Sequence, residues 1–254
     1  MLLEPGHIFR VAPRFHCRAA WAERLQLNGG ATRRADTVCP RADWRAATVA
    51  ELAVLAPSGT SDASPLEAAH WALLTIPAHV RQRWWDAAER GEAGEGTQPG
   101  YDAFVADVLE LLRFKGLPVP PRCAAAVLVN RPGQTSTRLD GSGRLAGFCF
   151  GSLVPSSAAH GADDPIAVFN LGDEFAHLVM LNLGVHALRA RLAVDDATVA
   201  DEILSTFYLR QPAYPLVRVR LDPGEGLWLS SPPPAFDGWT VGKADLDALL
   251  VLQA

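Results

Sequence analysis

Short apolar runs separated by turn residues dominate the C-terminal half of the chain. Each run has the length of a β-strand, and Gly, Pro and Asp residues punctuate the intervals, as at Asp222-Pro223-Gly224 and Asp237-Gly238. Strands are predicted at residues 124–130, 144–153, 166–171, 177–183, 217–221, 226–229 and 248–252. Because strands this short and this close need antiparallel partners, the pattern predicts a jelly roll, a cupin-like double-stranded β-helix, rather than a parallel α/β sheet.

Helical spacing is found mainly in the N-terminal half. Residues 44–55 carry apolar side chains at helical intervals. A second helix is predicted from Ser64, with Pro65 at its first position. Pro77 should break or kink this helix before residues 80–85.

The most regular amphipathic pattern covers residues 101–114, where five apolar side chains fall on one helical face. Residues 195–204 predict a further, capped helix between the two halves of the sheet. We therefore expect one α+β domain. Residues 1–122 would form a mainly helical N-terminal elaboration packed on a jelly-roll core of residues 123–254.

Charge and hydropathy argue against two classes of function. The 28 acidic and 23 basic residues give a net charge of -5, which provides no electrostatic footprint for nucleic acid. The sequence contains no run of about 18 apolar residues, and its first residues do not resemble a secretion signal. We expect a soluble, cytoplasmic protein that binds neither nucleic acid nor membranes.

The four cysteines are Cys17, Cys39, Cys123 and Cys149. They lie far apart and form no C-x-x-C pair, so the zinc-ribbon and thioredoxin motifs are absent. Free thiols in a reducing compartment are the expected state.

Six stretches carry a resemblance to a known family when taken in order: residues 129–134, 144–147, 170–172, 214–225, 236–240 and 245–249. Together they resemble bacterial non-haem iron, 2-oxoglutarate-dependent oxygenases, particularly those that tailor natural products. The resemblance covers roughly the C-terminal half of the chain. It implies a double-stranded β-helix core and a place in natural-product biosynthesis.

The same resemblance implies where an iron site would lie. These enzymes hold iron with a His-x-Asp/Glu pair and a distal His. The three positions fall on Cys149, Gly151 and Phe236, so neither histidine nor the carboxylate is present. A basic residue should also bind 2-oxoglutarate, and Lys243 is the one cation near the expected places, although an exposed turn lysine is the more ordinary interpretation.

Other metal ligands are few. None of the seven histidines lies in an H-x-D or H-x-E pair. His160 and Asp163, in a polar loop, could form a shifted ligand pair. His177 lies in an apolar run and is typical of a hydrogen-bonded core histidine. We predict no cofactor of this chain's own, and expect Fe(II) and 2-oxoglutarate only through a partner subunit or if the assignment of ligand positions is shifted.

A pocket between the predicted sheets would be mainly aromatic and would suit a small apolar organic ligand. Its candidate residues are Phe148, Phe150, Phe169, Asn170, His177, Trp228, Phe236 and Lys243.

Three hypotheses follow. In the first, the chain is an iron-deficient pseudoenzyme and a non-catalytic partner of an active related oxygenase, as a heterodimer, or a homodimer. In the second, it is an enzyme that uses the pocket for metal-independent cyclisation, elimination or hydrolysis, with acid or base groups from Cys149, His160, Asp173, Glu174 or His177. In the third, it is an iron oxygenase with an unusual triad.

Overall fold

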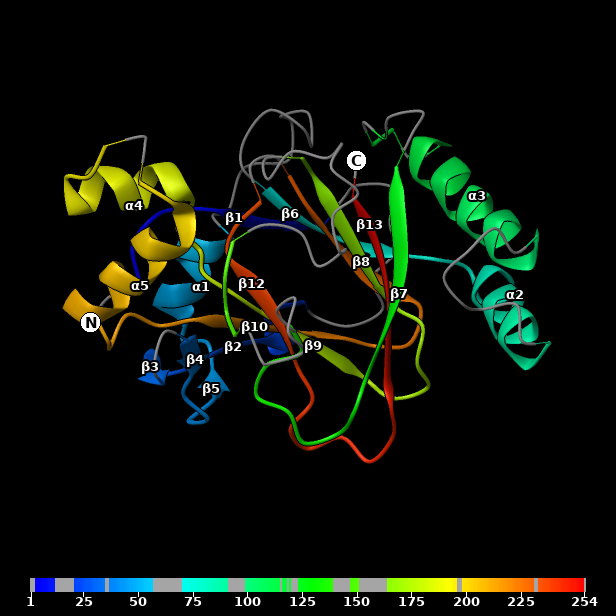
Figure 1. Ribbon diagram of the computed structural model, residues 1–254, viewed down its shortest axis with the longest axis horizontal. Helices are drawn as coiled ribbons and strands as arrows, with labels where there is room; N and C mark the ends of the chain where they lie inside the picture. Colours follow the sequence, from blue (N-terminus) through cyan, green and yellow to red (C-terminus); the bar gives the residue numbers. More distant parts are fainter. Residues whose placement is uncertain are drawn as a thin grey trace.

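Most of the chain can be assigned to strands and helices in the computed structural model. The structure describes residues 3–11, 21–34, 37–56, 70–90, 99–114, 116–117, 119, 123–138, 147–150, 164–195, 198–230 and 233–253. Within these ranges the fold is α+β, with five α-helices and three sheets (Figure 1).

The largest sheet has six strands, and its pairings are antiparallel except for one parallel pair at one edge, β1 with β6. In spatial order the strands are β1 (Ile8–Val11), β6 (His70–Thr75), β11 (Glu225–Leu229), β8 (Ile166–Asn170), β13 (Asp247–Gln253) and β7 (Ala124–Asn130). Strands from both halves of the chain therefore build this sheet.

A second, five-stranded sheet is antiparallel throughout. Its order is β12 (Phe236–Trp239), β9 (Ala176–Met180), β10 (Val217–Leu221), β2 (Leu25–Leu27) and β5 (Arg45–Ala46). A separate hairpin joins β3 (Ala31–Arg34) to β4 (Thr37–Pro40).

From β7 onward the strand pairings are nested. The first strand, β7, pairs with the last, β13, and Cys149 bridges to Phe236 in β12. Inside these, β8 pairs with β11 and β9 pairs with β10. From the outermost pair inward, successive strand pairs fall alternately in the six-stranded and the five-stranded sheet. The C-terminal half is therefore arranged like one long two-stranded antiparallel ribbon that folds back and forth between the two sheets.

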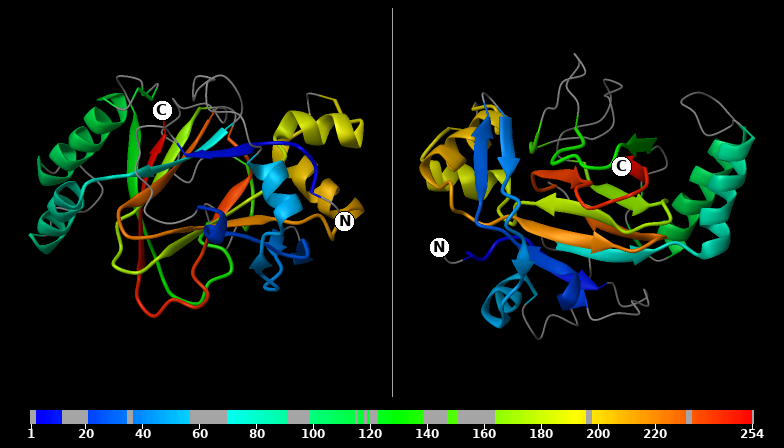
Figure 2. Two further views of the ribbon diagram at one scale, coloured as in Figure 1. Left: turned by 180° about the vertical axis from the view of Figure 1, so that it is seen from behind. Right: turned by 90° about the horizontal axis from the view of Figure 1, so that it is seen from below.

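Two hydrophobic clusters lie on the two faces of the six-stranded sheet. The first, between the sheets, contains Trp71 and Leu73 of β6 together with Val219 of β10. The second lies under α2 (Ala78–Glu89) and α3 (Pro99–Phe114), which pack side by side next to the sheet (Figure 2). This cluster contains Leu74 and Trp228. Because both faces of the central strands are buried, their sequences are continuous apolar runs rather than alternating ones.

The other helices lie on the opposite side of the sheets from α2 and α3 (Figure 1). They are α1 (Val49–Leu55), α4 (Val185–Leu192) and α5 (Ala200–Arg210), whereas the 3-10 helix η1 (Trp21–Arg24) packs against β10 and β2. A capping box starts α1, because the Thr48 side chain accepts from the Glu51 backbone while the Glu51 carboxylate accepts from the Thr48 backbone. Helix α5 packs against the β3–β4 hairpin. Among the described residues, no helix is both long enough and apolar enough to cross a membrane.

Residues 70–75 correct one prediction, because they form strand β6 instead of continuing a helix. Trp71 and Leu73 enter the cluster between the sheets, whereas Ala72 and Leu74 enter the cluster under the helices. A run buried on both faces has no alternation to distinguish it from a buried helix. The helix starts only at Ala78, after Pro77; the predicted start at Ser64 lies outside the described residues.

Two further predictions need correction. Asp237-Gly238 lies inside β12 and not at a turn, and Asp237 Oδ1 accepts buried hydrogen bonds there from the Thr137 backbone and hydroxyl. The helix predicted at residues 195–204 starts at Ala200, since Asp195 instead accepts hydrogen bonds from Thr198 in the preceding turn. Helix α4 was not predicted from the sequence.

Candidate functional site

Two of the three positions implied for an iron site lie side by side. Cys149 and Phe236 form an isolated antiparallel bridge, in which the Phe236 backbone N–H donates to the Cys149 carbonyl oxygen at 3.2 Å. The intermediate position, Gly151, lies outside the described residues. The structure therefore brings together two segments that are distant in the sequence.

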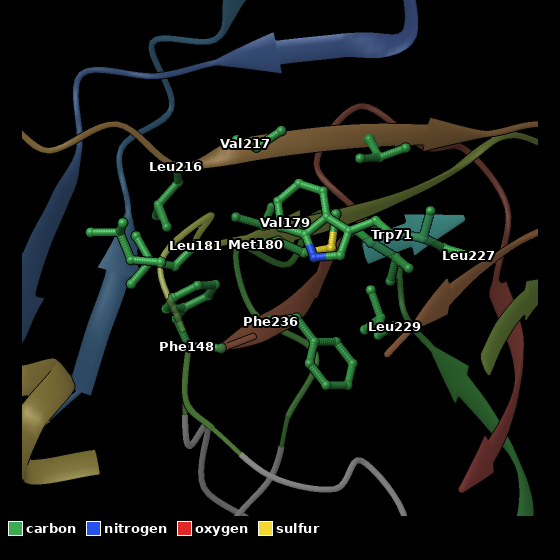
Figure 3. Close-up of a cluster of buried hydrophobic side chains, with 14 of the residues drawn as sticks. Trp71, Phe148, Val179, Met180, Leu181, Leu216, Val217, Leu227, Leu229 and Phe236 are labelled. Carbon is green, nitrogen blue, oxygen red and sulfur yellow. The ribbon is translucent and has the colours of Figure 1, made fainter. Parts of the chain in front are cut away.

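Apolar side chains fill the space next to this bridge. Phe236 is fully buried in the cluster between the sheets, and its register partner in β9 is Met180. Figure 3 shows Phe148, Phe236 and Trp71 in the same cluster, with Leu229 beside them. The phenylalanine ring thus contributes to the core at the position where the resemblance implies a histidine.

Cys149 is the one possible ligand of this pair. Burial raises the pKa of its thiol to about 12, outweighing the opposite effect of the Arg138 guanidinium. Arg138 Nη1 donates to the Cys149 carbonyl oxygen at 3.2 Å. At neutral pH the sulfur is therefore a protonated thiol, which is a poor metal ligand and a poor nucleophile.

These residues do not fit ferrous iron, which needs several nitrogen or oxygen donors around open positions. Phe236 supplies no donor atom, and Cys149 supplies only a protonated sulfur. Within the described ranges, no group of three or more His, Cys, Asp or Glu side chains could hold a metal ion. The shifted ligand pair of His160 and Asp163 lies outside those ranges.

Asp237, next to Phe236, connects β12 to the segment that follows β7. Its Oδ1 accepts hydrogen bonds from the Thr137 N–H at 3.0 Å, the Thr137 hydroxyl at 3.2 Å and the Gly238 N–H at 2.7 Å. A Cβ atom at Gly238 would lie 2.3 Å from Thr137 Oγ1, so only glycine fits this approach. Asp237-Gly238 therefore holds the segment at Thr137 against the sheet.

The other oxygen of Asp237, Oδ2, has no hydrogen-bond partner within the described structure, and neither does Ser136 Oγ. Burial raises the pKa of the Asp237 carboxyl, although the nearby Ser136 hydroxyl, the hydrogen bonds from Thr137 and Gly238, and Arg138 all act to lower it. We interpret the Ser136 hydroxyl as close to the carboxyl but outside hydrogen-bonding geometry. The sequence carries no motif that would have marked Ser136, Thr137 or Arg138 as neighbours of this site.

His177 lies on the opposite face of the five-stranded sheet from Phe236. In the β9–β12 register Phe236 pairs with Met180 and Trp239 pairs with His177, and residues an odd number apart point to opposite faces. Its Nδ1 has no hydrogen-bond partner among described residues. Burial lowers the His177 pKa to about 3, and Arg218, Arg220 and Lys243 lower it further. The imidazole is therefore neutral at physiological pH.

Lys243 is buried, contrary to the exposed turn lysine expected from the sequence. Its side chain is 0% exposed, and Nζ lies 2.6 Å from Asp247 Oδ1. Asp247 Oδ2 in turn accepts from Asn130 Nδ2 at 3.4 Å. The ion pair thus connects the turn after β12 with the paired strands β13 and β7.

The remaining aromatic candidates fall into two separate clusters. Phe148 and Phe236 lie between the sheets, and Phe150 packs against this cluster. Phe169 and Trp228 lie on the other face of the six-stranded sheet, under α2 and α3. The structure therefore does not bring all five rings around one pocket, because successive strand residues alternate between faces.

The side-chain amide of Asn170 is hydrogen-bonded to backbone groups. Its Nδ2 donates to the carbonyl oxygens of Glu174 at 2.7 Å and Leu221 at 3.0 Å, and its Oδ1 accepts from the Gly172 N–H at 2.9 Å. The fully buried amide thus organises the turn between β8 and β9.

The acidic candidates for metal-independent chemistry are engaged elsewhere. Asp173 is mostly exposed and pairs with Arg81 at 3.2 Å. Glu174 accepts from the backbone N–H groups of Ala244 and Asp245, each at 3.1 Å. Both carboxylates therefore stabilise loop contacts.

A groove that the sequence did not indicate lies along α5 and β3. It has a volume of about 540 Å³ and is lined by Arg33, Asp201, Glu202, Ser205, Thr206 and Leu209. Asp201 Oδ1 accepts from the Phe150 N–H at 3.1 Å, so the groove adjoins the segment that carries Cys149. Its acidic and basic side chains come from α5 and β3, and no local sequence pattern indicates that these two elements lie together.

Comparison with known protein families finds no family model that matches this chain, and comparison with functionally characterised proteins finds no significant match.

Proposed function

We propose that this chain is a double-stranded β-helix protein of oxygenase descent that has no iron site of its own and acts as a non-catalytic partner subunit of an active related oxygenase. The nested strand pairing supports the fold assignment. Eight strand segments, paired first with last and alternating between two sheets, are what a jelly roll requires. The pairings of β7 with β13 and of Cys149 with Phe236 are the two outermost of these.

The observation that carries the proposal is the buried ring of Phe236 beside Cys149. If a metal centre had merely lost its metal, polar ligand side chains should still point into the site. Here the position is occupied by an aromatic ring that is 0% exposed, in contact with the core between the sheets. Such close packing supports the interpretation that this position contributes to stability and not to iron chemistry.

Polar contacts are well formed in two of the stretches that carry the resemblance, residues 214–225 and 236–240, which supports a role that needs the folded body. Arg24 is buried and pairs with both Asp222 and Glu225, and the Glu225 carboxylate accepts from the Asp222 N–H at 2.8 Å. Asp237, inside β12, accepts hydrogen bonds from Thr137 and so connects two further segments. A protein with a related fold can associate with an active relative through matching surfaces, as in pseudo-symmetric dimers.

Metal-independent catalysis has less support. Among its candidates, Asp173 and Glu174 stabilise loops, and the Cys149 thiol is held protonated by burial. His177 lies on the opposite face of its sheet from Phe236. A general acid and a general base must both reach the same bound substrate, and these groups are not grouped around one cavity in the described structure.

Metal analysis tests the proposal. The protein is purified without oxygen, incubated with ferrous iron and 2-oxoglutarate, and desalted, alone and together with a related oxygenase from its own gene neighbourhood. The proposal predicts no stoichiometric iron in the isolated chain, co-elution with the oxygenase, and a changed rate of 2-oxoglutarate turnover in the mixture. The oxygenase alone is the control.

Stoichiometric iron in the isolated chain would overturn the assignment of Cys149 and Phe236 to ligand positions. Absence of co-elution and an unchanged oxygenase rate at micromolar concentration would overturn the role as a partner subunit.

A further inference from the structure

Within the part of the chain that the structure describes, strand β7 forms one edge of the six-stranded sheet and pairs with β13 alone. The direction of the β7 backbone groups follows from how β13 pairs with β8 on one side and with β7 on the other. The Leu171 N–H donates to the Ala248 carbonyl oxygen at 2.9 Å, so Ala248 directs its backbone groups toward β8. Leu249 then directs its own groups toward Leu128 of β7, because successive residues alternate.

It follows that Ala125, Val127 and Val129 direct their N–H and C=O groups away from β13, toward the free edge. No hydrogen bond joins these backbone groups to any residue that the structure describes. An edge of this kind is a template for a further strand, because unpaired backbone groups remain available.

The side chains of β7 offer none of the usual protection against such pairing. The seven residues, Ala-Ala-Ala-Val-Leu-Val-Asn, include no proline and no charged residue, whereas exposed edges in monomeric proteins usually carry lysine, proline or a bulge. Val129 is 59% exposed. The strand therefore has no feature that would repel a copy of itself.

We infer that β7 pairs with β7 of a second copy of this chain, forming a homodimer with one continuous sheet. A two-fold axis perpendicular to the sheet makes the two strands antiparallel. With the axis at Val127, each Val127 lies opposite its counterpart, and Ala125 lies opposite the partner's Val129. All three are residues with outward backbone groups, and each hydrogen-bonded pair exchanges two bonds.

The surface needed for a stable dimer extends beyond the strands. Specific interfaces bury about 1,200–2,000 Å², more than one seven-residue pairing supplies. In this arrangement the helical layers of both copies lie on the same face of the continuous sheet. The last residue of α3, Phe114, is 78% exposed, and Leu246, just before β13, is 57% exposed. Leu246 adjoins the Asn130 end of β7, because the next residue, Asp247, pairs with Asn130, and Phe114 ends the helix that precedes β7 in the chain. In the inferred dimer both exposed side chains provide further apolar area.

The homodimer goes beyond the proposed function and does not depend on it, because the paired edge needs neither iron nor an oxygenase. Its test uses the full chain at several micromolar concentrations. Sedimentation velocity measures the monomer–dimer equilibrium, and amide hydrogen exchange measures protection at Ala125, Val127 and Val129.

The inference predicts a concentration-dependent dimer in which these three amides are protected and lose protection on dilution. Val129→Lys should weaken the dimer at least about tenfold, because it puts a charge on the paired edge. Val49→Lys is the matched control, since Val49 is 86% exposed and lies in α1, which packs against β1 at the opposite edge of the six-stranded sheet from β7. The melting curves of both variants check that the fold is kept.

A monomer at every concentration would overturn the inference, as would a dimer that Val129→Lys leaves unchanged. Exchange in the wild-type protein decides the matter if that variant fails to fold. If the three amides became protected only when a related oxygenase was added, the edge would belong to that partner and the second copy would be excluded.

Discussion

The backbone N–H of Phe236 donates to the carbonyl oxygen of Cys149 at 3.2 Å, which joins two segments at the position that the oxygenase resemblance gives to metal ligands. Neither side chain behaves as a ligand there. One is a buried aromatic ring and the other is a thiol whose pKa is raised to about 12 by burial. The contact is consequently a packing feature, and it should be sensitive to changes in volume more than to changes in polarity.

Phe236→Ala should lower the free energy of unfolding by about 3–5 kcal/mol, because it removes a fully buried ring and leaves a cavity between the sheets. Urea unfolding followed by fluorescence measures the change. Leu209→Ala is the control, since Leu209 is 60% exposed and should cost no more than about 0.5 kcal/mol. A loss from Phe236→Ala as small as the control's would show that the ring is not part of the core.

Cys149 should resist alkylation. Because its pKa is raised to about 12, the thiolate population at pH 8 is very small, and the native protein should react with iodoacetamide much more slowly than the urea-unfolded protein. Mass spectrometry of the digested protein locates the modified residue. Rapid modification of Cys149 in the native state would indicate an activated thiol and would favour metal-independent chemistry over the role proposed above.

Six strands of the C-terminal half were predictable because each is a short apolar run near a turn signal, whereas the described part of the strand predicted at residues 144–153 forms only the bridge at Cys149. Asp222-Pro223-Gly224 is such a signal, and the structure confirms it as the turn between β10 and β11, with Gly224 at φ +80°. The β6 run was predicted wrongly as helix, because burial on both faces removes the alternation that identifies a strand. Asp237-Gly238 was mistaken for a turn, since its hydrogen bonds to Thr137 depend on a segment distant in the sequence.

The candidate site was less predictable than the fold. The resemblance pointed to Cys149 and Phe236, but the filling of the adjacent space depends on Trp71 and Met180, which no local pattern connects with them. Lys243 was expected to be exposed because a turn is usually solvated. Its burial depends on a tertiary arrangement that places Asp247 within 2.6 Å.

Asp237 should make stability fall as pH rises. Burial raises its pKa in the folded state above the ordinary value of 3.8, so above pH 3.8 the unfolded chain loses a proton that the folded protein retains. The free energy of unfolding then decreases with pH until the folded carboxyl also ionises. Asp237→Asn keeps an acceptor for Thr137 and Gly238 but cannot ionise, so its stability relative to the wild type should increase over this pH range.

Asp237→Ala is the matched variant. It leaves the N–H groups of Thr137 and Gly238 without their acceptor, and it should cost about 2–3 kcal/mol at the typical value for each lost hydrogen bond. Urea unfolding of the three proteins between pH 4 and pH 8 provides the comparison. Equal pH dependence of the wild type and Asp237→Asn would contradict the raised pKa.

The buried ion pair of Lys243 and Asp247 should show strong coupling. Lys243→Met leaves an uncompensated carboxylate that is 2% exposed, and it should cost about 3–5 kcal/mol. The double variant Lys243→Met/Asp247→Asn removes both charges and should recover part of this loss, with a coupling energy of about 1–3 kcal/mol. The surface pair of Arg45 and Glu51 is the control, because Arg45→Met should cost about 1 kcal/mol or less. If the losses of unfolding free energy caused by Lys243→Met and by Asp247→Asn simply added up in the double variant, the direct ion pair would be contradicted.

His177 should make the protein sensitive to acid. Burial lowers its pKa from 6.5 to about 3, so between these two pH values the unfolded chain binds a proton that the folded protein does not. Stability is therefore fully present above pH 6.5 and decreases as pH falls toward 3, by no more than about 1.4 kcal/mol per pH unit from this residue. His177→Gln removes the titration and should flatten the dependence of the urea midpoint on pH between 6.5 and 4. His79→Gln, which removes an exposed imidazole on α2, is the matched control. If His177→Gln kept the wild-type profile, the imidazole would have to be accessible to protons in the folded protein, and the outer face of the five-stranded sheet would be open at β9 rather than covered.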